Sequence, residues 1–160
     1  MNKEHAAEFS ILLVCLGNIC RSPMAEVLLK EAITKTLPQK AISVSSAGFI
    51  HNGEPASQPA EALMNEWGLN LSLHLSTKLT RKLVAGQDLI LTMEEEQAQR
   101  ISEMNEERPH IESIISYASH GEKHGDIIDP YGSPKQDYEA VAIQLKELVE
   151  EVVKRLLNVL

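Results

Sequence analysis

The pattern of hydrophobic and polar positions along the chain is of two kinds, one typical of strands and one typical of helices. Short apolar runs rich in β-branched residues are typical of buried strands, whereas apolar side chains at every third or fourth position are typical of amphipathic helices. The short runs predict four strands, at residues 10–14, 41–45, 88–93 and 111–115.

The segments between these runs carry helix start and stop signals. Pro23 favours a first helical turn, Pro38 ends that helix, and Gly68 supplies the residue that often follows a helix. The predicted helices span residues 23–37, 59–67, 94–104 and 137–160. A long loop precedes the last helix, whose apolar side chains form one stripe that predicts burial against the sheet: Tyr138, Val141, Leu145, Leu148, Val152, Leu156 and Val159.

Strands that alternate with helices predict an α/β fold. We expect a single three-layer domain, with helices on both faces of a four-stranded parallel sheet in the flavodoxin-like order 2-1-3-4. No repeat or low-complexity linker divides the chain, so residues 9–160 are predicted to form the domain and residues 1–8 a flexible N-terminal extension. Right-handed crossovers place the loops after the strands at one edge of the sheet, where ligands bind.

Composition narrows the function. The chain has 160 residues, 43% of them hydrophobic, and a net charge of −8, which argues against nucleic-acid binding because phosphate contacts need clustered Lys and Arg. No apolar run approaches the length of about eighteen residues that a membrane span requires, and residues 1–8 lack signal-peptide features. We therefore expect a cytoplasmic protein without membrane contact. Its two cysteines share one motif, which predicts reduced, chemically useful thiols.

That motif is V-C-L-G-N-I-C-R-S-P, at residues 14–23. A strand that leads through a short loop into a helix aims several backbone N–H groups at one point, and such a nest binds dianions. The same donors stabilise a thiolate at Cys15, Arg21 can grip two phosphate oxygens, and Ser22 can add a hydroxyl bond to the sulfur.

Thiolate attack on a phosphate ester also needs an acid that protonates the leaving oxygen and then activates water. Asp129, in the sequence D-P-Y-G, is the best candidate. By itself this tetrapeptide is more typical of a plain β-turn, but the phosphate loop favours the catalytic interpretation. Tyr131 can flank an aryl substrate.

Both motifs, in this order, resemble those of the low-molecular-weight protein tyrosine phosphatases. The resemblance covers nearly the whole chain and implies Cys15 as nucleophile, Arg21 as the phosphate and transition-state ligand, and Asp129 as general acid and base. It implies no cofactor or metal, and phosphorylated proteins as partners of a monomer or weak dimer. Further implied site residues contact the phosphate or substrate (Leu16, Gly17, Asn18, Ile19, Cys20, Ser22 and Tyr131) or brace the loop (Asn18, Ser22, Ser46 and His74).

The substrate remains open between two classes. The sequence S-H-G-D-I-I-D-P-Y-G resembles the bacterial branch that includes protein-arginine phosphatases, and Gly132 stands where animal members have a second tyrosine. Arginine-specific members carry threonine where this chain has Ile19, so we expect phosphotyrosine to be preferred. The stretch 49–55 is short where many members carry a longer loop with an aromatic wall, so the resemblance does not imply that wall here. An arsenate reductase, which needs further cysteines, and a phosphate-sensing binding module are more remote alternatives.

Three other features have two interpretations each. Cys20 is either a small buried hydrophobe or a disulfide partner that protects an oxidised Cys15. His120 and His124 are spaced like metal ligands, but flanking glycines break the helix that would align them, so we expect loop residues and no metal. Glu94 is expected in a solvated helix start, with contact to the active-site edge as the alternative. His74 is either a buried core histidine or a brace of the loop.

Overall fold

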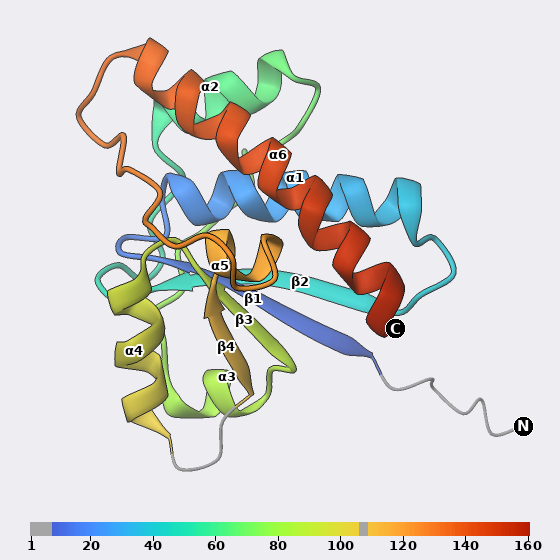
Figure 1. The fold of residues 1–160 in the computed structure, drawn as a ribbon. Coiled ribbons are helices and arrows are strands. Elements are labelled where there is room, and N and C mark those ends of the chain that lie inside the picture. Colours follow the sequence, from blue (N-terminus) through green and yellow to red (C-terminus); the bar gives the residue numbers. More distant parts are fainter. Residues whose placement is uncertain (1–7, 106–108) are drawn as a thin grey trace, which may run out of the picture.

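The computed structural model describes residues 8–105 and 109–160 (Figure 1). Of the expected flexible extension, residues 1–7 lie outside the described residues. The sheet contains strands β1 (Phe9–Cys15), β2 (Ile42–Gly48), β3 (Leu89–Thr92) and β4 (His110–Ser113). The helices are α1 (Arg21–Thr36), α2 (Gln58–Glu66), α3 (Arg81–Ala85), α4 (Glu95–Met104), α5 (Ile114–Ala118) and α6 (Lys135–Val159).

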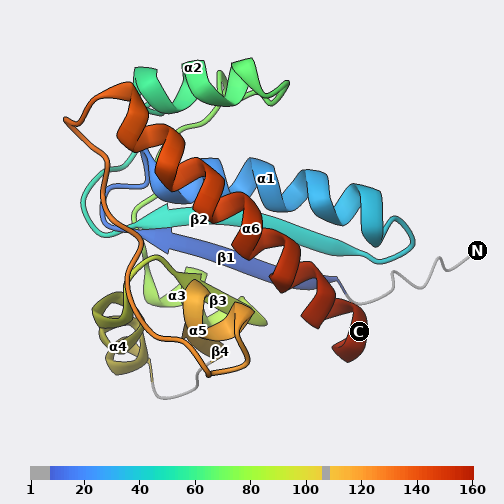
Figure 2. The same cartoon turned by 45° about the horizontal axis from the view of Figure 1, so that its top comes forward.

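All strand pairs are parallel and the order is β2-β1-β3-β4, as predicted. Central strand β1 has buried side chains on both faces because successive residues of a strand point to opposite sides. Ile11 and Leu13 join the core beneath α1, α5 and α6, whereas Leu12 and Val14 join the smaller core beneath α3 and α4. Figure 2 shows these two helical layers on either side of the sheet.

Two short helices were not predicted, because each is started by a local hydroxyl cap. The side chain of Ser113 accepts a hydrogen bond from the Ser116 amide, so α5 begins at Ile114 and the predicted fourth strand, which extended to residue 115, was too long. Thr80 caps α3 in the same way, through the Leu83 amide. Helices α1 and α6 each begin two residues earlier than predicted, at Arg21 and Lys135.

The long C-terminal helix α6 packs against α1 and crosses it obliquely on one face of the sheet (Figures 1 and 2). Its buried residues include Tyr138, Leu145, Val152 and Leu156 of the predicted stripe, while Val159 is exposed at the end of the helix. Within the described ranges, no helix has both the length and the apolar character that a membrane crossing demands.

Candidate active site

The cysteine motif forms a loop between the end of β1 and the start of α1. Cys15 is the last residue of the strand and its side chain is buried. Its sulfur lies 3.0 Å from the hydroxyl oxygen of Ser22 and accepts a hydrogen bond from the Asn18 amide at 3.2 Å. Donors of this kind stabilise a thiolate relative to a thiol. The serine contact is the one that the sequence suggested.

Asn18 holds the loop together from its centre. Its φ of 56° lies in the left-handed region that Asn tolerates better than most residues, and it is fully buried. Its side-chain amide donates to the Ser22 hydroxyl at 2.8 Å and its side-chain oxygen accepts from the Thr77 amide at 2.9 Å. The His74 ring nitrogen lies 2.8 Å from the Asn18 carbonyl oxygen. His74 therefore contacts the loop directly.

The carbonyl groups of the loop point away from the sulfur, toward neighbouring segments. The Leu16 carbonyl accepts from the Phe49 amide and the Ile19 carbonyl accepts from the Ser57 amide, both at 2.8 Å. In the part of the chain that the structure describes, the amides of Gly17, Ile19 and Cys20 have no hydrogen-bond acceptor. A loop whose carbonyls at Leu16, Asn18 and Ile19 are hydrogen-bonded and whose amides at Gly17, Ile19 and Cys20 are free is suited to an anion.

Arg21, the first residue of α1, has a side chain that is only 2% exposed. Its Nη1 donates to the Ile127 carbonyl oxygen at 2.7 Å and lies 2.9 Å from Glu94 Oε2, while Nη2 lies 3.7 Å from Asp129 Oδ2. Of the two interpretations of Glu94, the structure supports contact with the active-site edge, although the side chain remains 29% exposed at the helix start. This residue caps α4 and holds the buried guanidinium, because the ends of parallel strands β1 and β3 are neighbours.

Asp129 forms the β-turn that its tetrapeptide predicts and also faces the cysteine loop, as the catalytic interpretation requires. Its Oδ1 accepts a hydrogen bond from the Tyr131 amide at 3.1 Å, which is the turn geometry, while Oδ2 faces Arg21. Gly132 has a φ of +79°, which L side chains rarely adopt, and this conformation allows the chain to continue toward α6. The turn therefore presents one carboxylate oxygen, with 44% of the side chain exposed, to the cysteine loop.

A cavity of about 360 Å³ lies above the loop. Predicted site residues and two further side chains form its walls: Cys15, Leu16, Gly17, Ile19, Cys20, Arg21, Ile50, His51, Asp129 and Tyr131. Sequence reasoning missed Ile50 and His51. The only available signal was their position after the second strand, at the edge where the loops of a parallel sheet meet. The aromatic residue of this stretch, Phe49, packs instead under Arg100 at 4.1 Å.

Beneath the loop, Cys20 forms a buried polar cluster with two residues that the sequence did not connect to it. Its sulfur lies 3.3 Å from the hydroxyls of Ser57 and Tyr138, which are themselves 3.3 Å apart. Burial raises the pKa of Cys20 above its usual value and raises the pKa of Tyr138 to about 12. Cys20 is therefore a hydrogen-bonded, protonated thiol rather than a simple hydrophobe.

Ser46 does not reach the loop that it was expected to brace. It pairs with Leu13 in the sheet, two residues before Cys15, and its hydroxyl donates to Glu26 Oε1 at 2.7 Å. This contact ties β2 to α1. The bracing contacts come instead from His74 and Thr77, which follow α2.

The glycine-rich segment before Asp129 packs against the start of α4. His124 Nδ1 lies 3.1 Å from Glu95 Oε1, and Asp126 Oδ1 accepts from the Glu95 amide at 2.9 Å. His120, in contrast, has a left-handed φ of 55° in the turn after α5. His120 and His124 therefore lie in different parts of the loop, and each has its own local surroundings.

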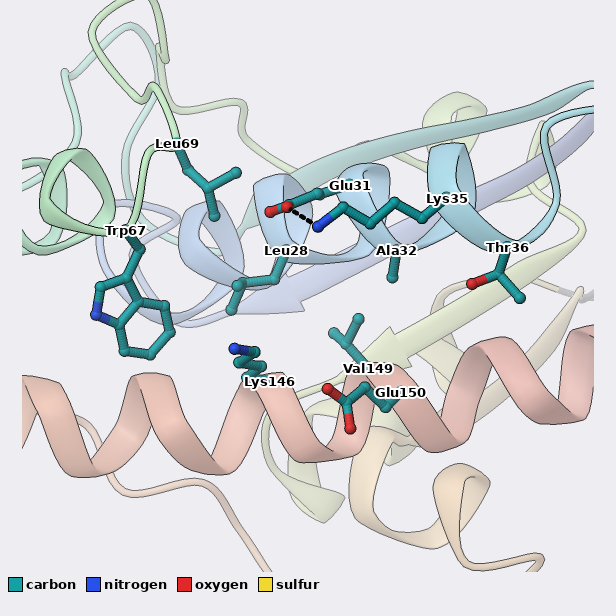
Figure 3. A pocket seen from close by; sticks show the side chains of 10 residues that line it. All are labelled: Leu28, Glu31, Ala32, Lys35, Thr36, Trp67, Leu69, Lys146, Val149 and Glu150. Atoms are coloured by element: carbon teal, nitrogen blue, oxygen red, sulfur yellow. Dashed lines mark hydrogen bonds and ion pairs between the residues drawn. The ribbon is translucent and has the colours of Figure 1, made fainter.

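A second cavity, of about 460 Å³, lies between α1 and α6 near Trp67 (Figure 3). Its apolar wall includes Leu28 and Val149, and its charged side chains include a Glu31–Lys35 ion pair. The Lys146 ammonium already lies over the Trp67 ring, 5.8 Å from its centroid. In contrast to the cavity above the cysteine loop, none of the described residues that line this cavity is a cysteine, histidine or aspartate.

The fold and the loop define an α/β domain with a buried cysteine in a loop at the edge of its parallel sheet. The family model of the low molecular weight phosphotyrosine protein phosphatases matches residues 10–159 of this chain. The chain belongs to this family and is therefore a hydrolase.

Individual relatives carry two different activity names. The chain is 33% identical to the probable low molecular weight protein-tyrosine-phosphatase AmsI of Erwinia amylovora, over 92% of this chain and 96% of that protein. It is 34% identical to the protein-arginine-phosphatase of Bacillus subtilis (strain 168), over 91% and 95% of the two chains. The crystal structure of a YwlE mutant from Bacillus subtilis superposes with a TM-score of 0.85 at 31% identity, covering 93% of this chain and 99% of that one.

Proposed function

We propose that this chain hydrolyses protein phosphotyrosine through a phosphocysteine at Cys15. The observation that carries the proposal is the position of the Cys15 sulfur, which the Asn18 amide and Ser22 hydroxyl contact inside a loop of free amides. Arg21 and Asp129 stand together at the same cavity. These groups supply the nucleophile, oxyanion donors and acid that phosphate-ester cleavage requires.

The reaction proceeds in two half-reactions. The Cys15 thiolate attacks phosphorus, the bond to the tyrosine oxygen breaks, and Asp129 gives its proton to that oxygen. Water then attacks the phosphocysteine, the ionised Asp129 takes a proton from it, and inorganic phosphate leaves as the thiolate is restored. Arg21 and the loop amides bind the equatorial oxygens, where charge is held throughout.

Cys15→Ser removes the thiolate and should abolish turnover of an aryl phosphate, because a serine hydroxyl is not ionised at neutral pH. Asp129→Asn should slow phosphocysteine formation by about 10²- to 10⁴-fold, since amide nitrogen cannot protonate the leaving oxygen. Stopped-flow detection of released alcohol, together with mass spectrometry of the trapped phosphocysteine, measures both effects. Normal turnover by Cys15→Ser would refute the mechanism.

The second candidate substrate is protein phosphoarginine, which the similarity to the Bacillus subtilis protein-arginine-phosphatase favours. The side chains of Ile19 and Tyr131 support phosphotyrosine, because apolar and aromatic walls suit a phenyl ring better than a polar guanidinium. A comparison of kcat/KM for matched phosphotyrosine and phosphoarginine peptides distinguishes the two. Ile19→Thr should shift the ratio toward phosphoarginine; a wild-type preference for phosphoarginine would reverse the assignment.

We further propose that the protein is redox-sensitive. Both cysteines are free and line one cavity, so peroxide can oxidise Cys15 to a sulfenic acid, which the Cys20 thiol converts to a disulfide with loss of water. Mass mapping after mild peroxide treatment should find this link. Over-oxidised Cys15 without a Cys15–Cys20 disulfide would exclude this protective role.

We also propose that the protein is located in the bacterial cytoplasm, where thiols such as Cys15 are kept reduced. We expect a monomer or weak dimer, and analytical ultracentrifugation measures this oligomeric state.

A further inference from the structure

A groove of about 660 Å³ adjoins the catalytic cavity. The two share three walls, Ile19, His51 and Tyr131, so the groove begins where the mouth of the cavity ends. It continues over Glu54 and Pro55, between the segment after β2 and the turn that carries Asp129. A ligand held at the cysteine loop therefore meets this groove as it leaves the cavity.

The groove combines an apolar surface with one carboxylate. Ile19, Pro55 and Tyr131 supply nonpolar area, and the Tyr131 side chain is largely exposed. Glu54 is the one acidic residue among the described residues that line the groove, and no Lys or Arg is among them. The Glu54 carboxylate also has no ion pair within the described ranges.

The backbone of Glu54 is fixed although its side chain is exposed. Its amide donates to the Ser76 hydroxyl at 2.9 Å, and its carbonyl accepts from the Ser76 amide at 2.7 Å. The neighbouring Pro55 forms a bridge with Leu75 in the same segment. The carboxylate is thus presented from a rigid wall, which lowers the entropic loss when a partner binds.

The groove is continuous with the cavity above the cysteine loop, and this continuity indicates what the groove binds. A phosphorylated side chain that places its phosphate between Cys15 and Arg21 leaves its own polypeptide at the mouth, beside Ile19 and Tyr131. We propose that the groove binds the substrate segment next to the phosphorylated residue, and that Glu54 selects a Lys or Arg in that segment. This inference rests on the proposed function, because it needs a polypeptide substrate.

Phosphotyrosine peptides that differ only in one flanking residue test the proposal. Each position on both sides of the phosphotyrosine carries Lys, Ala or Glu in turn, and kcat/KM is divided by the value of the same variant for phenyl phosphate. At one or more positions, Lys should exceed Glu by about three- to tenfold, the range expected for an exposed charge pair compared with an exposed repulsion. The preference should weaken as salt is added.

Two substitutions at Glu54 and one matched control complete the test. Glu54→Gln should bring the Lys-to-Glu ratio close to one, and Glu54→Lys should invert it. Glu61→Gln removes a carboxylate from α2 that faces a different depression, so it should keep the wild-type ratio. A wild-type ratio near one at every position, or a ratio that Glu54→Gln leaves unchanged, would overturn the inference. Absence of hydrolysis for every phosphotyrosine peptide would instead overturn the proposed function.

Discussion

Arg21 is a buried cation whose orientation is set by its partners in the folded chain. A buried cation must be paired, because the penalty for removing an isolated charge from water is several kcal/mol in practice. Glu94 and the Ile127 carbonyl satisfy one terminal nitrogen, whereas the other is directed toward Asp129 at 3.7 Å. The planar guanidinium is thereby held in one orientation, with its remaining donors available at the cavity.

The Glu94 contact predicts a defect in catalysis. Glu94→Gln keeps an oxygen for the capping contacts of α4 but removes the charge that orients Arg21. We expect kcat/KM for an aryl phosphate to fall by about 10- to 100-fold, as is usual when a positioning contact is lost. The matched control is Glu96→Gln, an exposed residue on the same helix, which should behave as wild type. Equal activity of the two variants would contradict this role for Glu94.

Tyr138 predicts a dependence of stability on alkaline pH. Burial raises its pKa to about 12 in the folded chain, above the unfolded value near 10. Its contribution to the free energy of unfolding is therefore complete below about pH 10 and is lost as the pH rises through about 12. Tyr138→Phe should lower the free energy of unfolding by about 0.5–1.5 kcal/mol at neutral pH, because it removes the hydroxyl contacts.

Urea unfolding over a range of pH measures this difference between wild type and Tyr138→Phe. The difference should shrink as the pH rises through the window above, because only the wild type has the phenol that must ionise. Tyr131→Phe, at an exposed ring, provides the control. If the difference in the free energy of unfolding between wild type and Tyr138→Phe stays constant with pH, burial does not raise the pKa of Tyr138.

At the scale of elements, the end of β2 supports the cysteine loop by close backbone contact. Gly48 pairs with Cys15, and its amide and carbonyl bond to Thr77 and Leu79 in the segment after α2. A Cβ at Gly48 would lie 2.9 Å from both the Asn18 amide nitrogen and the Leu16 carbonyl oxygen. These are backbone atoms of the loop itself, so a side chain at this position must displace the loop.

Gly48→Ala should therefore lower both stability and activity. We expect a loss of about 1–3 kcal/mol in the free energy of unfolding, the usual effect of overpacking, and at least about a tenfold loss of kcat/KM. Gly86→Ala is the control, because its nearest atoms lie at 3.6 and 3.7 Å and its φ is −82°. Should Gly48→Ala match Gly86→Ala in activity, the loop does not depend on this contact.

At the scale of the whole molecule, the larger core joins α1, α5 and α6 to one face of the sheet. Leu145 lies at the middle of α6 and is fully buried in this core. Trp67, the only tryptophan of the chain, packs against the same core where α2 ends. A change in the core is therefore visible both in tryptophan fluorescence and in the circular dichroism of the helices.

Leu145→Ala should lower the free energy of unfolding by about 2–5 kcal/mol, through lost burial and the cavity that remains. The exposed Leu157→Ala, on the same helix, should change it by no more than about 0.5 kcal/mol. Because one core serves the sheet and its main helical layer, fluorescence and circular dichroism should report one urea transition. Separate transitions for the two probes would mean that α6 unfolds independently.

Local sequence was sufficient for the regular elements and the phosphate loop. Apolar runs, prolines and glycines act on their near neighbours, so they determined the four strands, the longer helices and the strand–loop–helix context of Cys15 and Arg21. The short helices α3 and α5 escaped prediction because each depends on a single hydroxyl cap.

Only the tertiary structure decided which distant residues meet. Glu94 reaches Arg21 because the ends of parallel strands β1 and β3 are neighbours at one edge of the sheet. Thr77 reaches Asn18 from the segment after α2, and Ser57 and Tyr138 reach Cys20 from the starts of α2 and α6. Ser46 donates to Glu26 rather than to the loop, because its position in the sheet register, opposite Leu13, lies below the loop. Periodicity encodes which face of an element is buried, but not which side chain lies opposite. The sequence therefore identified the candidate catalytic residues, and packing determined the contacts that support them.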